Sequence, residues 1–224
     1  MTTQPYLDKV LAHKEPYEVD VFGKPITVLP EIMSPKYDWA GLFMIDFLPK
    51  DFTGRDVLEV GPASGLVSVF VGLRGANSIT AADISPKAVE NTKLNLEKYN
   101  IQNSRALVSD VFDNEEVQDR KYYDIIFNLP YHDSTPQNDL EKGVMDEGYH
   151  AMVKLFAGGK SLLKDGGKMY VGFSRSGNIE RFQEEIRKNN IRIERMDEKN
   201  AWDDPKYSSP DFHYNCQVYQ LSFA

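Results

Sequence analysis

The sequence predicts an α/β protein built on one doubly wound, mostly parallel sheet. Two observations support this fold class. From residue 56 onward, short apolar strands alternate with amphipathic helices. The last two strands then follow each other with no helix between them, which places an antiparallel hairpin at one edge of the sheet.

The individual elements follow from apolar spacing and from the turn residues that separate them. Strands are expected at residues 56–60, 78–82, 105–108, 123–127, 168–173, 191–196 and 214–223, and helices at 39–48, 66–73, from 86 onward, at 147–163 and at 178–188. Ser85-Pro86 marks a helix start, with serine as the N-cap and proline at the first position. Residues 197–212 are expected to form a loop between the two closing strands.

The first 50 residues are rich in proline and aromatic side chains and show little sustained periodicity. Residues 19–29 are expected to form a short hairpin that turns at Gly23-Lys24. We therefore expect an N-terminal flap, residues 1–50, followed by a single domain, residues 51–224.

Composition narrows the classes of partner. The formal net charge of the 224-residue chain is −8, and its basic residues are scattered, which disfavours RNA as a partner. The single cysteine, Cys216, cannot form a disulfide framework or a cysteine zinc site, and no metal is expected. Without a run of ~20 apolar residues or a secretion signal, we expect a cytoplasmic protein with no membrane partner. The oligomeric state is left open.

A glycine turn follows the first strand of the domain, in the segment Val57-Leu-Glu-Val-Gly-Pro-Ala-Ser-Gly65. Glycine lets the backbone approach a ligand closely, and the N-terminus of the next helix can donate to that ligand. A dinucleotide fingerprint would need glycine at 61, 63 and 66, where this chain has Gly61, Ala63 and Leu66. The turn suits a nucleotide-like ligand that has no pyrophosphate.

This turn resembles motif I of class I S-adenosylmethionine-dependent methyltransferases, and Ala82-Asp-Ile-Ser-Pro-Lys-Ala-Val-Glu-Asn91 resembles their "small domain" group. The resemblance spans about residues 55–175 and implies a Rossmann-like, seven-stranded methyltransferase sheet with an antiparallel C-terminal hairpin. It implies S-adenosylmethionine as the cofactor and S-adenosylhomocysteine as the product. Asp83 would bind the ribose hydroxyls, Asp110 would face the adenine amino group, and Glu59 would help to hold the methionine end. The expected cofactor-binding residues are Glu59, Gly61, Ala63, Gly65, Asp83, Ile84, Asp110, Val111 and Asn128.

Asn128-Leu-Pro-Tyr131 follows the fourth strand and resembles the Asn/Asp-Pro-Pro-Tyr signature of methyltransferases that act on amino groups attached to a π-system. Such a nitrogen is a poor nucleophile because its lone pair is delocalised. The Asn128 side-chain oxygen and the Leu129 carbonyl can accept its N–H bonds and aim the lone pair, and Tyr131 can stack on the planar group. The expected catalytic residues are Asn128, Leu129, Pro130 and Tyr131. Leu129 keeps the carbonyl but lacks the fixed φ of proline.

Five further residues are expected near the acceptor: Tyr37, Trp39, His132, Asp133 and Trp202. Tyr37 and Trp39 precede the core of the domain. Their side chains are expected either to stack on the ligand or to pack the N-terminal flap on the sheet. Whether His132 takes part in proton transfer is open. The long polar segment from Ser134 to Glu147 is typical of a lid.

The sequence thus predicts an N-methyltransferase (EC 2.1.1) that acts on a planar amide or amino nitrogen of a protein side chain or a small molecule. Methylation of an rRNA or tRNA base, at adenine N6 or guanine N2, is one alternative. A non-catalytic S-adenosylmethionine-binding protein of the same fold is another. Asn-Leu-Pro-Tyr also occurs in rRNA adenine dimethyltransferases, but those usually carry glutamate where this chain has Asp83. The identity of the acceptor and the number of methyl groups transferred stay open.

Overall fold

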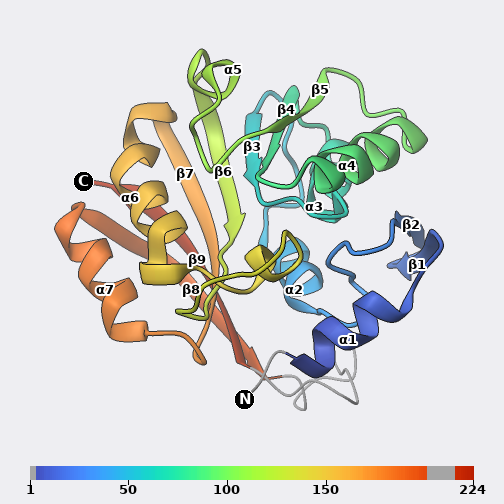
Figure 1. The fold of residues 1–224 in the computed structure, drawn as a ribbon. Coiled ribbons are helices and arrows are strands. Elements are labelled where there is room, and N and C mark those ends of the chain that lie inside the picture. Colours follow the sequence, from blue (N-terminus) through green and yellow to red (C-terminus); the bar gives the residue numbers. More distant parts are fainter. Residues whose placement is uncertain (1–3, 201–214) are drawn as a thin grey trace.

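The computed structural model describes residues 4–200 and 215–224, and its centre is a seven-stranded sheet in the order β5-β4-β3-β6-β7-β9-β8 (Figure 1). The strands are β3 (Asp56–Val60), β4 (Ser78–Asp83), β5 (Ser104–Val108), β6 (Tyr122–Asn128), β7 (Leu163–Ser174), β8 (Ile191–Asn200) and β9 (Asn215–Phe223). Strands β3 to β7 are parallel, whereas β9 runs antiparallel to both β7 and β8. The predicted fold class and its antiparallel closing pair are confirmed.

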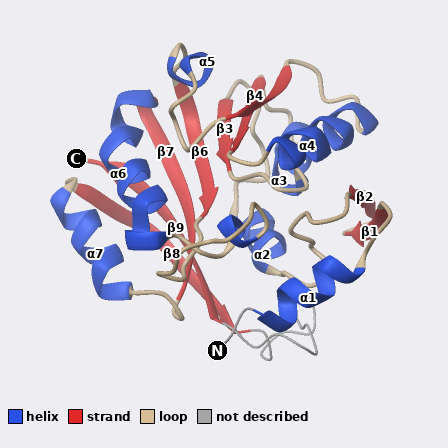
Figure 2. Ribbon diagram, in the orientation of Figure 1, coloured by secondary structure: helices blue, strands red, loops and turns tan. Residues whose placement is uncertain are grey.

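Helices cover both faces of this sheet (Figure 2). One face carries α2 (Ala40–Phe47), α3 (Leu66–Leu73) and α4 (Pro86–Lys98), and the other carries α6 (His150–Leu162) and α7 (Ile179–Lys188). Neighbouring residues of a strand point to opposite faces, so Val57 packs in the core under α2 and α3 while Leu58 packs in the core under α6. Burial on both faces explains why the parallel strands read as nearly continuous apolar runs.

The N-terminal segment adds a separate two-stranded sheet, β1 (Tyr17–Val21) and β2 (Lys24–Val28). Phe22 and Gly23 form its turn and both have positive φ, as a two-residue hairpin turn requires. The predicted hairpin is confirmed, but its turn lies one residue earlier than the expected Gly23-Lys24, since Lys24 pairs with Val21. Helix α1 (Gln4–Ala12) lies in a segment for which the sequence predicts no regular structure.

Two buried asparagines of α4 hold the hairpin against the main sheet. The Asn91 side chain accepts a hydrogen bond from the Leu29 N–H at 2.8 Å and donates to the Thr27 carbonyl at 2.8 Å. Asn95 accepts from the Thr27 N–H at 3.0 Å and donates to the same carbonyl at 2.7 Å. The end of β2 and the segment after it then reach the start of α4, where Val28 and Ile32 pack with Ala88.

Besides α1, the structure differs from the expected elements at several places, among them β7, which starts at Leu163 and not at residue 168. Strand β8 continues to Asn200, so the expected loop start at residue 197 is wrong, since residues 197–200 pair with β9. The expected helix at 147–163 begins as a 3-10 turn, Glu147–Tyr149, and α6 proper starts at His150, because Gly148 and Tyr149 have positive φ. A short helix, α5 (Glu115–Gln118), was not among the expected elements.

Within residues 4–200 and 215–224, no helix has the length and apolar character that crossing a membrane would need.

Candidate active site

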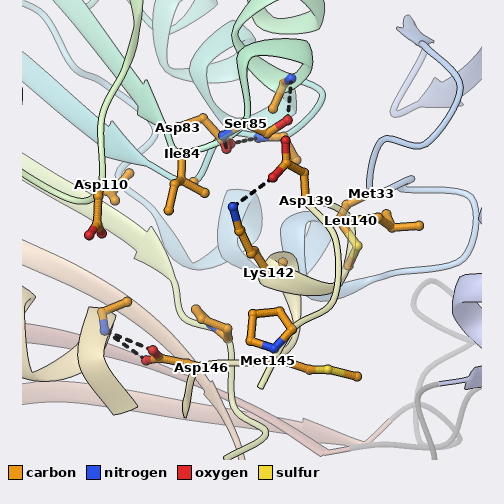
Figure 3. Close-up of a pocket in the computed structure, with 18 of the residues that line it drawn as sticks. Met33, Asp83, Ile84, Ser85, Asp110, Asp139, Leu140, Lys142, Met145 and Asp146 are labelled. Carbon is orange, nitrogen blue, oxygen red and sulfur yellow. Dashed lines mark hydrogen bonds and ion pairs between the residues drawn. The ribbon is translucent and has the colours of Figure 1, made fainter. Parts of the chain in front are cut away.

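A cavity of about 520 Å³ lies at the carboxyl ends of the parallel strands (Figure 3). In open α/β sheets, ligands bind at this end where the strand order reverses, which here is between β3 and β6. The volume is in the range of small-molecule sites. The cavity wall from the strand ends consists of Val60, Gly61, Ala63, Ala82, Asp83, Ile84, Ser85, Ser109, Asp110, Val111, Phe127, Asn128 and Pro130. Four segments that are far apart in the sequence therefore meet at one cavity.

Gly61 shapes the turn between β3 and α3. Its φ is +65°, and a Cβ atom at this position would lie 2.9 Å from Cε2 of Phe127, which lines the cavity. Ala63 also has positive φ and lines the cavity, and Gly65 is the N-cap of α3. The turn holds its backbone against the cavity wall, where a side chain at position 61 would collide with Phe127.

Asp83 lines the cavity and joins the glycine turn to the loop after β4. It is 8% exposed; its Oδ2 accepts a hydrogen bond from the Ala63 N–H at 3.1 Å, and its Oδ1 accepts from the Ser85 N–H at 2.9 Å. Burial raises the pKa of Asp83, and these hydrogen bonds oppose the rise. An ionised carboxylate has about four acceptor positions, so capacity for a ligand's hydroxyl groups remains.

Asp110 follows β5 by two residues and contacts α6. Its Oδ2 is 3.2 Å from Lys154 Nζ and 3.6 Å from His150 Nε2. Its side chain is 37% exposed, so these contacts leave it open to solvent and to a ligand. Val111, the next residue, is buried and has positive φ. Asp110 is therefore fixed by α6 at the rim of the cavity.

Glu59 lies inside β3 and is not part of the cavity wall. It is 5% exposed, and the Ser68 hydroxyl of α3 donates a hydrogen bond to its Oε2. Burial raises the pKa of Glu59 from its ordinary value of 4.5 to about 7, although the Ser68 hydrogen bond acts in the opposite direction. This carboxyl group therefore ionises at a higher pH than an exposed glutamate.

The Glu59→Gln variant is expected to be more stable than the wild type by about 3 kcal/mol at pH 8 but by less than about 1 kcal/mol at pH 5. The pKa is raised in the folded state, so the unfolded chain loses its proton first. Wild-type stability therefore falls as the pH rises from 4.5 towards about 7. Glutamine can keep the Ser68 hydrogen bond and cannot ionise. Denaturant unfolding of the ligand-free protein at both pH values measures the difference, with Glu97→Gln on the exposed side of α4 as the control. A stability gain that is equal at both pH values would contradict the assignment.

The tetrapeptide begins at the end of β6, and Asn128 and Pro130 line the cavity. Leu129 is 2% exposed, and its N–H donates to the Gly172 carbonyl of β7 at 3.0 Å. The Tyr131 N–H donates to the Val144 carbonyl at 3.2 Å, and burial raises the pKa of its phenol group. Neither Leu129 nor Tyr131 belongs to the cavity wall. In this structure the tetrapeptide thus presents its first and third residues to the cavity.

The aromatic residues expected from the flap lie away from the cavity wall. The Tyr37 hydroxyl forms a hydrogen bond with Nε2 of His13 at 2.7 Å. Trp39 is 3% exposed and packs in the core with α2. Both aromatic side chains therefore pack within the protein, which is the alternative to stacking on a ligand. Trp202 lies outside the described residues.

His132 and Asp133 lie beside the tetrapeptide and form contacts within the protein. The His132 main chain bridges to Met145, and burial lowers the pKa of its imidazole. Asp133 Oδ1 accepts a hydrogen bond from the Gly148 N–H at 2.7 Å. Neither residue lines the cavity. Their contacts with Met145 and Gly148 instead join the end of the tetrapeptide to the segment before α6.

Three further parts of the cavity wall come from segments that no motif marks. They are the pocket loop (residues 134–147), the segment after the hairpin, and the start of α6. Their lining residues are Pro136, Asp139, Leu140, Lys142, Gly143, Met145, Asp146 and Glu147, then Glu31, Ile32, Met33 and Asp38, and finally His150 and Ala151. The apolar residues Leu140, Val144 and Met145 within an otherwise polar segment are the signal that could have indicated packing there.

The pocket loop packs on α1 through a small apolar cluster, which we call the loop cluster: Tyr6, Leu7, Val10, Leu140 and Val144. The five side chains are all buried. The Val144 carbonyl also accepts hydrogen bonds from the N–H groups of Tyr131 and His132, at 3.2 and 3.0 Å. Helix α1, the pocket loop and the tetrapeptide are therefore joined in one chain of contacts.

The Leu7→Ala variant is expected to release bound S-adenosylhomocysteine about tenfold faster than the wild type, because weaker packing of α1 frees the pocket loop to open. Leu7 is 2% exposed, and truncating such a side chain costs about 2 kcal/mol or more. Stopped-flow displacement measures the dissociation rate. Leu11→Ala on the same helix is the matched control, since Leu11 is 37% exposed. Equal rates for the two variants would show that the loop cluster does not hold the loop.

The cavity wall is acidic. It contains the carboxylates of Glu31, Asp38, Asp83, Asp110, Asp139, Asp146 and Glu147, against the basic side chains of Lys142 and His150. Lys142 Nζ lies 2.8 Å from Asp139 Oδ1 (Figure 3), so this lysine is already paired. Such a wall favours cations and hydrogen-bond donors over phosphate groups. Among the described residues, no group of three or more His, Cys, Asp or Glu side chains is placed to hold a metal ion.

Comparison with known proteins identifies relatives over much of the chain. The chain is 33% identical over 124 residues to a candidate protein N5-glutamine methyltransferase of Methanocaldococcus jannaschii. This alignment covers 55% of the chain and 58% of that protein. The chain is 25% identical over 158 residues to the ribosomal RNA large subunit methyltransferase G of Vibrio cholerae, covering 69% of this chain and 39% of that one. The chain thus spans about three fifths or less of the length of these two relatives.

Solved structures share the fold at low sequence identity. A candidate methyltransferase crystallised with S-adenosylhomocysteine aligns with a TM-score of 0.68 and 15% identity, over 93% of this chain and 56% of that chain. A candidate RNA methyltransferase from Pyrococcus horikoshii aligns with a TM-score of 0.59 and 14% identity, over 100% of both chains. These alignments confirm the fold expected from the resemblance to class I methyltransferases.

The family model described as "Methyltransferase small domain" matches residues 26–200, which include the end of the hairpin strand β2, the glycine turn, Asp83, Asp110 and the tetrapeptide. The chain therefore belongs to the methyltransferase small domain family.

Proposed function

We propose that the chain binds S-adenosylmethionine in the cavity and transfers its methyl group to a planar nitrogen of a protein side-chain amide or a small molecule. One observation carries the proposal. Asn128, the first residue of the tetrapeptide, lines the same cavity as Asp83 and Asp110, the two carboxylates expected to hold the nucleoside. A nucleoside held by those carboxylates and an acceptor held by Asn128 would therefore share one cavity.

The residues of the cavity fit the cofactor. Asp83 is buried and keeps acceptor capacity for the ribose hydroxyls, and Asp110 at the rim would accept from the adenine amino group. The absence of a side chain at Gly61 leaves room that a Cβ atom would fill. The acidic wall suits the positive sulfonium group. The bound cofactor would supply an activated methyl carbon.

In the proposed reaction, the protein orients the acceptor nitrogen. The side-chain oxygen of Asn128 and the carbonyl of Leu129 accept its two N–H bonds and favour the pyramidal geometry in which the lone pair is free. That lone pair would form the new N–C bond with the methyl carbon that the bound cofactor would supply, and the electron pair of the broken S–C bond would stay on sulfur. The extra proton on nitrogen leaves to water afterwards, so no strong base is required at the site.

We further propose residues 51–224 as the catalytic domain and residues 1–50 as a flap that completes the cavity. Glu31, Ile32, Met33 and Asp38 from the flap are part of the cavity wall. The hairpin that precedes them is docked on α4 by Asn91 and Asn95. This arrangement supports a flap that is structurally integrated with the cofactor site.

An RNA base is the second candidate acceptor, because relatives of this chain are named as ribosomal RNA methyltransferases. The acidic cavity wall and the net charge of −8 favour the protein or small-molecule acceptor instead, since phosphate groups would be repelled. The name of the archaeal N5-glutamine relative agrees with an amide acceptor.

A labelling experiment separates these candidates. Lysate from cells that lack the protein is incubated with the purified chain and tritiated S-adenosylmethionine, and the labelled product is treated with RNase or protease. Label that resists RNase supports the proposal, and label lost with RNase establishes the RNA base. Tight binding of S-adenosylhomocysteine in calorimetry without transfer to any fraction would identify a non-catalytic binding protein.

A further inference from the structure

Gly172 of β7 lies directly beside Asn128. The two residues are partners in the parallel register of β6 and β7. A Cβ atom on Gly172 would overlap the Oδ1 atom of Asn128 and lie 3.2 Å from its Cγ. The next neighbour, Cε of Met44, would be 3.3 Å away, at the movable end of a flexible side chain. The Asn128 amide therefore occupies the space that a side chain at position 172 would take.

The backbone at position 172 does not itself require glycine. Gly172 is an interior residue of β7 and is absent from the positive-φ residues of the chain, so alanine can adopt its conformation. Glycine in the interior of a buried strand weakens the strand and often marks a close approach of another group. Here the group that approaches is the amide of Asn128.

Gly172 also forms a hydrogen bond with the main chain of Leu129, the residue that carries the second acceptor group of the tetrapeptide. Its carbonyl accepts the hydrogen bond from the Leu129 N–H at 3.0 Å, which fixes the residue whose own carbonyl faces the acceptor nitrogen in the proposed reaction. A single residue therefore borders the side chain of Asn128 and anchors the backbone of Leu129.

We propose that Gly172 is a positioning residue for methyl transfer, required as glycine so that the side-chain oxygen of Asn128 can lie against β7, in the position from which it would accept an N–H bond of the acceptor nitrogen. This inference rests on the proposed function of Asn128. A methyl group at position 172 would push the amide away from the strand. A displacement of about 1 Å in a positioning group can slow a reaction about a hundredfold.

The test is a double-mutant cycle with Gly172→Ala, Asn128→Ala and the variant that carries both substitutions. Gly172→Ala is expected to lose about a hundredfold in transfer rate while its affinity for S-adenosylhomocysteine stays within about threefold of the wild type. It is expected to lower the melting temperature in the wild-type background but not in the Asn128→Ala background, where the amide is gone. Equal thermal costs in both backgrounds would overturn the inference.

Gly159→Ala on α6 is the matched control. Its added Cβ would lie 2.7 Å from Sδ of Met169, another β7 residue, and neither Gly159 nor Met169 belongs to the cavity wall. It is expected to cost stability without slowing transfer. If Gly172→Ala alone fails to fold, recovery of folding in the double variant supports the inference, and failure of both overturns it.

The outcomes for the two proposals are distinct. Wild-type transfer by Asn128→Ala would overturn the proposed function of the tetrapeptide. Loss of transfer in Asn128→Ala together with wild-type transfer in Gly172→Ala would overturn only the positioning role.

Discussion

Replacing Asn128 by alanine is expected to slow methyl transfer by at least about a hundredfold, the loss typical of removing one preorganised polar group from an active site. The acceptor nitrogen gains positive charge as its new bond forms, so a fixed amide oxygen stabilises the transition state more than the ground state. Affinity for S-adenosylhomocysteine is expected to change by less than about tenfold, because the nucleoside would be held by Asp83 and Asp110. Initial rates of tritium transfer and calorimetry measure the two quantities.

The conservative variant Asn128→Asp serves as the comparison. It keeps an oxygen at the same place, as the Asn/Asp alternation of the signature does, and is expected to retain measurable transfer. Transfer by the alanine variant at the wild-type rate would remove the tetrapeptide from the mechanism. Loss of both transfer and product binding would indicate a damaged fold.

Replacing Asp83 by alanine is expected to weaken S-adenosylmethionine binding by about a hundredfold or more. The change removes the proposed acceptor of the ribose hydroxyls. It also leaves the N–H groups of Ala63 and Ser85 without the carboxylate that joins their loops. Hydrogen bonds to charged groups contribute about 1.5–3 kcal/mol each, and about 2.7 kcal/mol corresponds to a hundredfold change in affinity. Isothermal titration with the cofactor measures the effect.

Asp139→Ala is the matched control for this prediction. Asp139 also lines the cavity, but its carboxylate is paired with Lys142 at 2.8 Å and holds no backbone group of the glycine turn. Its removal is expected to change the affinity by less than about threefold. If the two variants bind the cofactor equally well, Asp83 is not the ribose partner.

The parallel half of the fold is predictable because short stretches of sequence mark each of its strands and turns. Strands β3, β4, β5 and β6 are short apolar runs bounded by turns, and the start of α4 is marked by the Ser85-Pro86 cap, whose hydroxyl accepts from the Ala88 N–H in the structure. Each strand ends in the loop that the motifs identify. The parallel arrangement alone brings those loops together, since the carboxyl ends of parallel strands lie at one edge of the sheet.

The rest of the cavity depends on contacts between distant segments. Helix α1 has only a narrow apolar side, and its partners Leu140 and Val144 lie about 130 residues further along the chain. Neither segment carries a sequence pattern that predicts contact with the other. The burial of Glu59 against Ser68 and the turn of Tyr131 away from the cavity wall likewise follow from packing that a linear pattern does not contain. The positions of the expected acceptor residues therefore depend on long-range packing more than those of the expected cofactor residues do.

The two asparagines that dock the hairpin have a consequence for self-association. A strand at the edge of a small sheet offers unpaired N–H and C=O groups to any other chain that arrives in an extended form. In β2 the outward-facing groups of Thr27, and the N–H of Leu29 just beyond it, are already bonded to Asn91 and Asn95. Side-chain amides of α4 thus take the place of a third strand. They close this edge to intermolecular pairing while leaving the sheet two strands wide.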